Sequence, residues 1–273
     1  MIAMPDRISL SPQHGGVARL RRRLGALEEA QNPGKSLLPF GIPSLDAALG
    51  GGLVTGALHE IAAARETEIP AATGFTLALA ARTEGPLVWI AEDMAIWESG
   101  APYGPGLFAL GLAPERLIAV AAAKSRDVLW AMEEALACGA GAVLGEIRGL
   151  IDFTASRRLS LAAGKGRALA LLLRSAPGPD ASAAATRFIV GAAPAASSRA
   201  MVIGPGPPRF SLQLRRNRRG HLGAWVLEWN CVEQRFNASA DREPVAQAAR
   251  DRPRQAATLP WRGRVAAEGG GVG

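Results

Sequence analysis

The chain has 273 residues, 48% of them hydrophobic, and a formal net charge of +7, values that fit a globular protein with a sizeable core. Its two cysteines, Cys138 and Cys231, are far apart and lack metal-ligand spacing, so we expect neither a disulfide scaffold nor a metal site. Charged residues interrupt every long apolar stretch, and the first thirty residues lack the apolar run of a signal peptide. These patterns predict a cytoplasmic protein without membrane contact.

Residues 1–34 form the first of three predicted parts. Apolar residues recur at helical spacing among arginines between positions 17 and 27, and Asn32-Pro33-Gly34 follows. This pattern predicts a short basic amphipathic helix and a linker. The apolar stripe either packs on the body of the protein or docks on a partner or nucleic acid, and the pattern leaves both alternatives open.

Residues 35–236 form the second part, in which apolar strands alternate with helices. The predicted strands cover 58–62, 86–91, 116–122, 142–147 and 168–174, and the predicted helices cover 71–83, 105–111, 124–138 and 152–164, with a Gly/Pro loop at 99–106. Near-continuous apolar strands separated by helices are typical of a parallel sheet that is covered on both faces. The sequence therefore predicts an α/β fold.

The pattern changes after Pro177. A strand is predicted at 187–193, and the segments 210–216 and 224–230 alternate apolar and polar residues around the turn RNRRGHLG. This spacing predicts an antiparallel hairpin that extends the sheet. Residues 237–273 are polar and rich in Ala, Arg and Pro, which predicts a disordered basic tail.

The segment LHEIAAARETEIPAATGFT (58–76) has the order of a strand, a phosphate loop and a helix. A working loop needs glycines that bring backbone N–H groups to the phosphates, a lysine, and a Ser or Thr hydroxyl for Mg²⁺. The loop is degenerate at Ala63, Arg65, Glu66 and Gly74, and Glu66 and Glu68 add negative charge. Gly34-Lys35-Ser36 is a chance match because no strand precedes it. We therefore expect no ATP binding, no cofactor and no catalytic residue.

Three acidic residues follow predicted strands. Glu92 and Asp93 come after the second strand, and Glu146 ends the fourth. Open α/β sheets place functional carboxylates at these strand ends. Without a phosphate cradle beside them, we assign these residues to structural or partner contacts.

Basic residues concentrate near the C-terminus, with twelve arginines against five acidic residues between positions 207 and 264. The hairpin turn holds a cluster that predicts binding of nucleic acid or of an acidic partner: Arg215, Arg216, Asn217, Arg218 and Arg219. The alternatives are a solvated turn and the general arginine bias of a GC-rich genome. Trp225 and Trp229 share one face and are either core residues or platforms for bases. In the tail, Trp261, Arg262 and Arg264 form a candidate partner-binding motif.

Several segments together resemble a known superfamily. LPFGIPSLDAALGGGLVTGALHEI (38–61) is similar to the entrance of the RecA core, and PLVWIAED, GAGAVLGEIRGL and SRRLSLAAGKGRALALLLR continue the resemblance in order. Within that superfamily, RRLSLAA with LLLR, and PRFSLQLRRNRRGHLGAWVLEW (208–229), most resemble the inducible mutagenesis protein A (ImuA) family, RecA- and SulA-like proteins with a degenerate phosphate loop. The resemblance covers about residues 35–236.

The resemblance implies a RecA-like core and a non-enzymatic accessory role in DNA-damage-induced (SOS) mutagenesis and translesion synthesis. Its implied partners are an inactive Y-family-like polymerase homologue and an error-prone C-family polymerase, with RecA as a further candidate, in the cytoplasm or at the nucleoid. A SulA-like inhibitor of cell division is the alternative. The missing lysine and glycines mean that ATPase and recombinase activities are not carried over.

Overall fold

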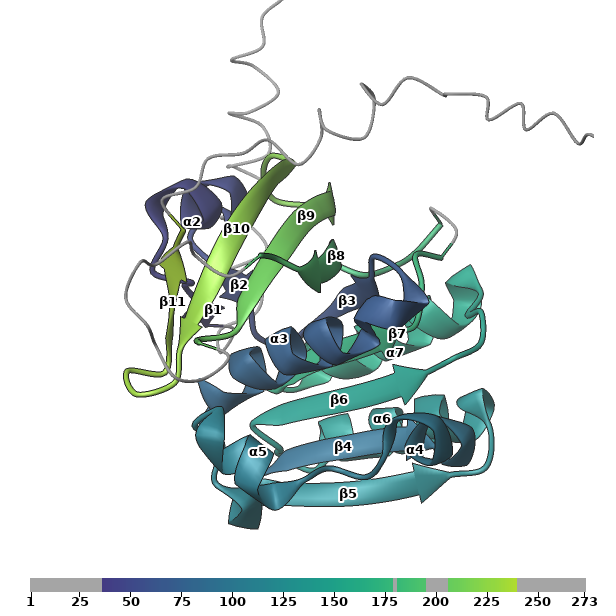
Figure 1. Cartoon of the computed structure of the whole chain (residues 1–273). Coiled ribbons are helices and arrows are strands. Elements are labelled where there is room, and N and C mark those ends of the chain that lie inside the picture. The colour runs from purple at the N-terminus through teal and green to yellow at the C-terminus, as the bar shows by residue number, and fades with distance from the viewer. Residues whose placement is uncertain (1–35, 179–180, 195–205, 240–273) are drawn as a thin grey trace, which may run out of the picture. The chain divides into compact units, whose positions relative to one another are not determined.

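A computed structural model of the protein describes residues 36–178, 181–194 and 206–239 (Figure 1). Its centre is a sheet of nine strands in the order β11-β10-β9-β8-β3-β7-β6-β4-β5. Six of them, from β8 to β5 in this order, run parallel, and β9, β10 and β11 are antiparallel. In chain order the nine strands are β3 (Ala57–Ala63), β4 (Leu87–Glu92), β5 (Leu117–Ala122), β6 (Ala142–Ile147), β7 (Leu169–Arg174), β8 (Thr186–Ala192), β9 (Arg209–Asn217), β10 (Gly223–Asn230) and β11 (Arg235–Ala238).

Helices cover both faces of the parallel strands, and a small separate ribbon pairs β1 (Leu37–Leu38) with β2 (Leu53–Val54). The helical elements are α2 (Pro43–Leu49), η1 (Glu66–Glu68), α3 (Ile69–Ala81), α4 (Asp93–Ser99), α5 (Gly104–Ala109), η2 (Pro114–Arg116), α6 (Ser125–Ala137) and α7 (Phe153–Lys165). One apolar core packs α2, α3 and α5 on one face, and a second packs α6 and α7 on the other. None of the helices in the described ranges is long and apolar enough to cross a bilayer.

Burial on both faces explains the continuous apolar strands. Every residue of β6 is buried, and α6 packs on it through Val128, Met132 and Leu136. Gly145 in β6 permits this close contact, because a Cβ at that position would lie 2.0 Å from the Sδ of Met132. The strand pattern that the sequence predicted therefore follows directly from a sheet between two helical layers.

A cluster of phenylalanines joins the antiparallel strands to the parallel ones. Phe75 of α3 contacts Phe40, Phe188 of β8, Phe210 of β9 and Phe236 of β11, with ring centroids 5.4–6.3 Å apart. Such aromatic pairs add to the stabilisation from apolar burial. The predicted hairpin is thus confirmed as part of the same core.

The structure confirms the predicted α/β architecture with its antiparallel extension, and it adds several elements that were not predicted, among them α2, the β1–β2 ribbon, α4 and β11. Helix α4 precedes the predicted 99–106 loop, where no helix was expected. Strand β11 places Asn237 and Ala238, the first residues of the predicted tail, in register with β10. The remaining tail residues from 240 onward, and the predicted N-terminal helix, lie outside the described residues.

Candidate functional site

The connection between β3 and α3 occupies the position of the degenerate phosphate loop. Arg65 donates two hydrogen bonds to the carboxylate of Glu68, at 3.0 and 3.2 Å, so the two charges neutralise each other. This carboxylate raises the pKa of Arg65. Helix α3 opens with Ile69 and Pro70, where a phosphate loop supplies lysine and hydroxyl side chains. Proline also has no N–H to offer a phosphate.

The four residues assigned to the degenerate loop are not gathered in one site. Ala63 is buried at the end of β3, whereas Arg65 and Glu66 are exposed in the connection. Gly74 lies in α3, beyond the loop, and faces the ring of Phe210. A Cβ there would meet Phe210 Cε1 at 3.7 Å, an ordinary contact distance. Gly74 is therefore a residue of the helix–hairpin junction.

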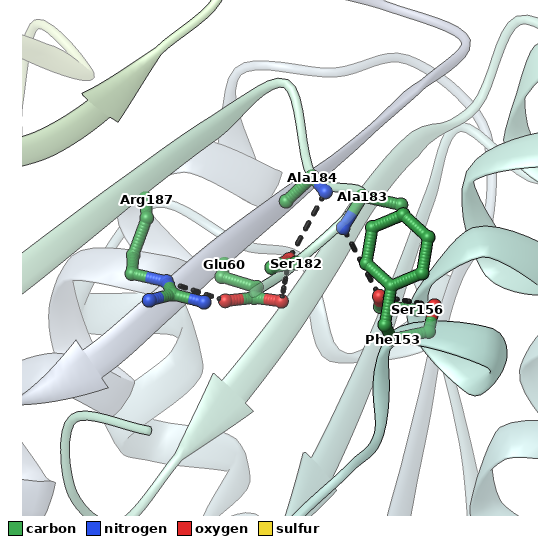
Figure 2. A network of polar contacts seen from close by, with 7 residues as sticks. All are labelled: Glu60, Phe153, Ser156, Ser182, Ala183, Ala184 and Arg187. Atoms are coloured by element: carbon green, nitrogen blue, oxygen red, sulfur yellow. Dashed lines mark hydrogen bonds and ion pairs between the residues drawn. The ribbon is translucent and has the colours of Figure 1, made fainter. Parts of the chain in front are cut away.

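A buried polar network connects β3 with β8 and α7 (Figure 2). Glu60 is 1% exposed and accepts a 2.8 Å hydrogen bond from Arg187 Nε and another from the hydroxyl of Ser182. Ser182 Oγ in turn accepts from the Ala184 N–H. The Ser156 hydroxyl of α7 accepts a 3.0 Å hydrogen bond from the N–H of the neighbouring Ala183. These bonds fix the segment that leads into β8 against the second helical layer.

The network gives the acidic residue of the LHEIA strand a structural role. A buried carboxylate is tolerated when a cation and further donors compensate for its lost hydration, as Arg187 and Ser182 do for Glu60. The acidic residue within a mostly apolar strand was the sequence signal for such a pair. Its partners could not be found from spacing, because Arg187 is 127 positions away.

The acidic residues at the carboxyl edge of the sheet have different surroundings. Glu92 accepts a 2.5 Å hydrogen bond from the Ser125 hydroxyl and a 3.1 Å bond from the Arg148 N–H, whereas Asp93 is exposed at the start of α4. Glu146 is buried, and its ion pair with Arg148 Nη2 is 3.6 Å long. Burial raises the pKa of Glu146 and the charge of Glu92 adds to the effect, while Arg148 and Trp89 oppose it.

Glu146 and Trp89 line a cavity of about 460 Å³ between α3, α5 and the segment 99–103. We call it the α3–α5 cavity. A smaller cavity of about 140 Å³ shares Trp89, Glu146 and residues 100–102. No sequence pattern indicated this site, because its walls come from five separate elements, α3, β4, α4, α5 and β6. It borders the connection between β3 and α3, since Ile69 and Pro70 form part of its wall.

The hairpin tip, residues 215–219, divides into structural and exposed members. Asn217 Nδ2 donates to the Ala48 carbonyl at 2.8 Å, and its Oδ1 accepts from the Arg219 N–H. This contact satisfies a carbonyl in the last turn of α2. Arg218 Nη2 donates to the Ala183 carbonyl at 2.7 Å. Arg215 is exposed, and Arg216 and Arg219 are half-buried.

The two tryptophans of β10 serve the core. Trp229 is fully buried, and its indole N–H donates to the Leu110 carbonyl at 3.1 Å. Trp225 is half-buried against the same core, with its N–H donating to Ser44 Oγ. Trp229 therefore cannot stack on a base. Glu228 forms an ion pair with Arg209 at the base of the hairpin. The tail motif Trp261, Arg262 and Arg264 lies outside the described residues.

Comparison with known proteins identifies relatives of the chain. The ImuA proteins of two Caulobacter vibrioides strains, NA1000/CB15N and ATCC 19089/CIP 103742/CB 15, are each 34% identical to it over 209 residues. The match covers 70% of this chain and 83% of each relative. The chain belongs to the ImuA family. Membership supports, at the level of the family, a role in damage-induced mutagenesis. No protein-family model matches the chain.

Family membership and the structure test different predictions made from the sequence. The identity of the family agrees with the resemblance drawn from the sequence motifs. The structure adds that Asn217 holds α2 and that Gly74 packs on Phe210. Among the described residues, we treat the hairpin tip with its exposed Arg215 and the α3–α5 cavity as candidate binding sites.

Proposed function

We propose that the chain is a non-enzymatic accessory factor in damage-induced mutagenesis and translesion synthesis. In this proposal it acts beside an inactive Y-family-like polymerase homologue and an error-prone C-family polymerase, with RecA as a further partner, in the cytoplasm and at the nucleoid. The observation that carries the non-enzymatic part is the opening of α3 by Ile69 and Pro70 behind the Arg65–Glu68 ion pair. This arrangement lacks the lysine of a phosphate loop.

The first experiment combines genetics with an assay of purified protein. Deletion of the gene is expected to abolish damage-induced mutagenesis, and the intact chain is expected to restore it. The purified chain is expected to show no ATP turnover above the buffer rate. Filamentation of overexpressing cells without any effect on mutagenesis would favour the SulA-like alternative. ATP turnover that is lost when residues 62–74 are changed would contradict the non-enzymatic assignment.

The hairpin tip is the surface that we propose for an anionic partner, with single-stranded DNA as the first ligand to test. Arg215 is the most suitable residue to substitute in a binding test, because it is exposed. Arg218 also bonds the Ala183 carbonyl, so its loss would mix binding with a structural effect. Arg126, with an 89% exposed side chain on α6, serves as a matched control.

Arg215→Ala is expected to weaken binding of a fluorescent single-stranded oligonucleotide and to lower the salt dependence of binding by about one phosphate contact. The double variant Arg215→Ala/Arg218→Ala should weaken it further, whereas Arg126→Ala should match the unmodified chain. Fluorescence anisotropy across a series of salt concentrations measures each. Binding that is unchanged in both Arg215 variants excludes DNA at the tip and leaves an acidic protein partner.

A further inference from the structure

The α3–α5 cavity has the size and lining of a ligand pocket. Its volume of about 460 Å³ lies within the usual range of such pockets, roughly 300–1,000 Å³. One wall is a single face of α3, and the opposite wall is α5 with the segment 99–103. Both helices lie on the same face of the sheet (Figure 1). The walls are largely apolar: Ile69, Pro70, Gly74, Leu77, Leu107 and Leu110.

Two buried polar side chains from neighbouring strands also line the cavity. Glu146 of β6 has a side chain that is 8% exposed, and Trp89 of β4 is 9% exposed. The indole of Trp89 lies close enough to favour the charged carboxylate, yet its Nε1 makes no hydrogen bond of normal geometry within the described residues. The contact of Glu146 with Arg148, at 3.6 Å, is longer than a hydrogen bond. The cavity therefore contains a buried carboxylate that a ligand can pair with.

The surroundings of the cavity are acidic although the chain is basic. The segment 92–115, of which residues 99–103, 106, 107 and 110 line the cavity, contains Glu92, Asp93, Glu98 and Glu115 but no lysine or arginine, in a chain of net charge +7. Arg148 is the basic residue beside Glu146, and it also contacts Glu98 and Ser99. Tyr103 of the wall and Phe108 of α5 are 71% and 74% exposed. Exposed aromatic residues around a pocket are typical of a protein-binding surface.

We propose that the α3–α5 cavity is a socket for an arginine side chain on a peptide segment of a partner protein. The guanidinium group binds the Glu146 carboxylate, and the aliphatic stem lies along the apolar wall of α3. The ring of Trp89 adds a surface for the planar cation. The acidic residues 92–115 attract the positive segment. This inference rests on the partner-binding function proposed above and names the chemistry of one partner surface.

The test uses the full chain and the probe N-acetyl-arginine amide. The indole ¹H–¹⁵N signal of Trp89, identified with Trp89→Phe, is expected to shift saturably with N-acetyl-arginine amide. The uncharged N-acetyl-citrulline amide, which has nearly the same shape, should shift it little, and N-acetyl-lysine amide should bind more weakly than arginine. Equal shifts with citrulline, no saturable shift with arginine, or tighter binding of lysine would each overturn the proposal.

Variants identify the residues that bind the probe. Glu146→Gln should weaken it about tenfold, since a charge-assisted hydrogen bond becomes a neutral one. Glu98→Gln changes an exposed residue, leaves the fold intact and should weaken it about twofold. Glu133→Gln, on α6, is the control and should leave binding unchanged. An equal loss in all three variants, or none in Glu98→Gln and Glu146→Gln, contradicts the assignment.

This test is separate from that of the proposed function. If arginine binding fails while deletion of the gene abolishes mutagenesis, only the socket is wrong. If arginine binds as expected and mutagenesis is normal in the deletion strain, the proposed function is wrong.

Discussion

The polar network around Glu60 and the hairpin tip both contain arginine, yet the two regions use it in different ways. Arg187 has a side chain that is 7% exposed and holds the carboxylate of Glu60 inside the sheet. Arg215 is exposed at the end of a hairpin whose turn is held by Asn217. Strands covered on both faces must compensate every charge that they bury, whereas a hairpin tip keeps its charges in water. We therefore expect stability effects from the first region and binding effects from the second.

The largest expected effect is in the network. Glu60→Leu removes the carboxylate that compensates Arg187 and should lower the free energy of unfolding by about 3–5 kcal/mol. Urea titration followed by circular dichroism measures the change. Glu133→Leu removes the partially exposed ion pair with Arg158 and should cost about 1 kcal/mol or less. Similar losses in the two variants would remove the distinction between buried and surface charge.

The second effect depends on pH and concerns His59 of β3. Its Nε2 donates to the Val54 carbonyl at 2.9 Å and its Nδ1 contacts the Thr186 hydroxyl at 2.7 Å, so the neutral ring is held in place. Burial lowers the pKa of His59 from 6.5 to about 4. As the pH falls, this histidine is protonated at a higher pH in the unfolded chain than in the folded protein, which favours unfolding. The stabilisation from the buried neutral ring is therefore complete above pH 6.5 and is lost as the pH falls toward 4.

Titration of His59 should lower the free energy of unfolding by about 3 kcal/mol between pH 6.5 and pH 4. Unfolding of the unmodified chain and of His59→Gln, compared at pH 7.5, 5.5 and 4.5, isolates this contribution from that of the carboxylates. The stability difference between the two proteins should shrink on acidification. If the difference in unfolding free energy between the two proteins is constant with pH, His59 is not buried in its neutral form. The interior of the parallel strands would then tolerate a charge, as the hairpin tip does.

The smallest effect is at the junction between α3 and the hairpin. Gly74→Ala should stabilise the protein by about 1 kcal/mol, because alanine favours the helix and its Cβ would sit at normal contact distance from Phe210. Gly145→Ala is the opposing control, since its Cβ would collide with Met132 and should destabilise. Thermal unfolding measures both. Destabilisation by Gly74→Ala would show that α3 and the hairpin pack more closely than described.

Several elements could be predicted because local patterns determine them. The apolar run AVLGEI predicted β6 at the same residues that the structure gives, and the alternation in 210–216 and 224–230 predicted β9 and β10. Helix α4 was missed because two of its three large apolar residues, Met94 and Trp97, face solvent and only Ile96 packs on the core. Strand β11 was missed because its four residues, RFNA, carry too short a pattern.

The candidate sites were predicted less completely, because they depend on contacts between distant segments. The arginine cluster was located from composition, but only the fold showed that Asn217 binds the Ala48 carbonyl, 169 positions earlier. Gly74 was assigned to a loop, although the chain has already entered α3 by Ile69. The α3–α5 cavity joins Ile69, Trp89 and Glu146, and no spacing rule relates these residues.

The sequence by itself determined the family resemblance, the alternating α/β order, the hairpin and the absence of a lysine from the 62–74 segment, because each is written in local order and residue type. Only the tertiary structure decided that Glu60 pairs with Arg187, that Trp229 is buried, and that Trp89 and Glu146 meet in one cavity. The reason is physical. Periodicity records which face of a strand is apolar, whereas the partner of a charge depends on which strands become neighbours in the sheet.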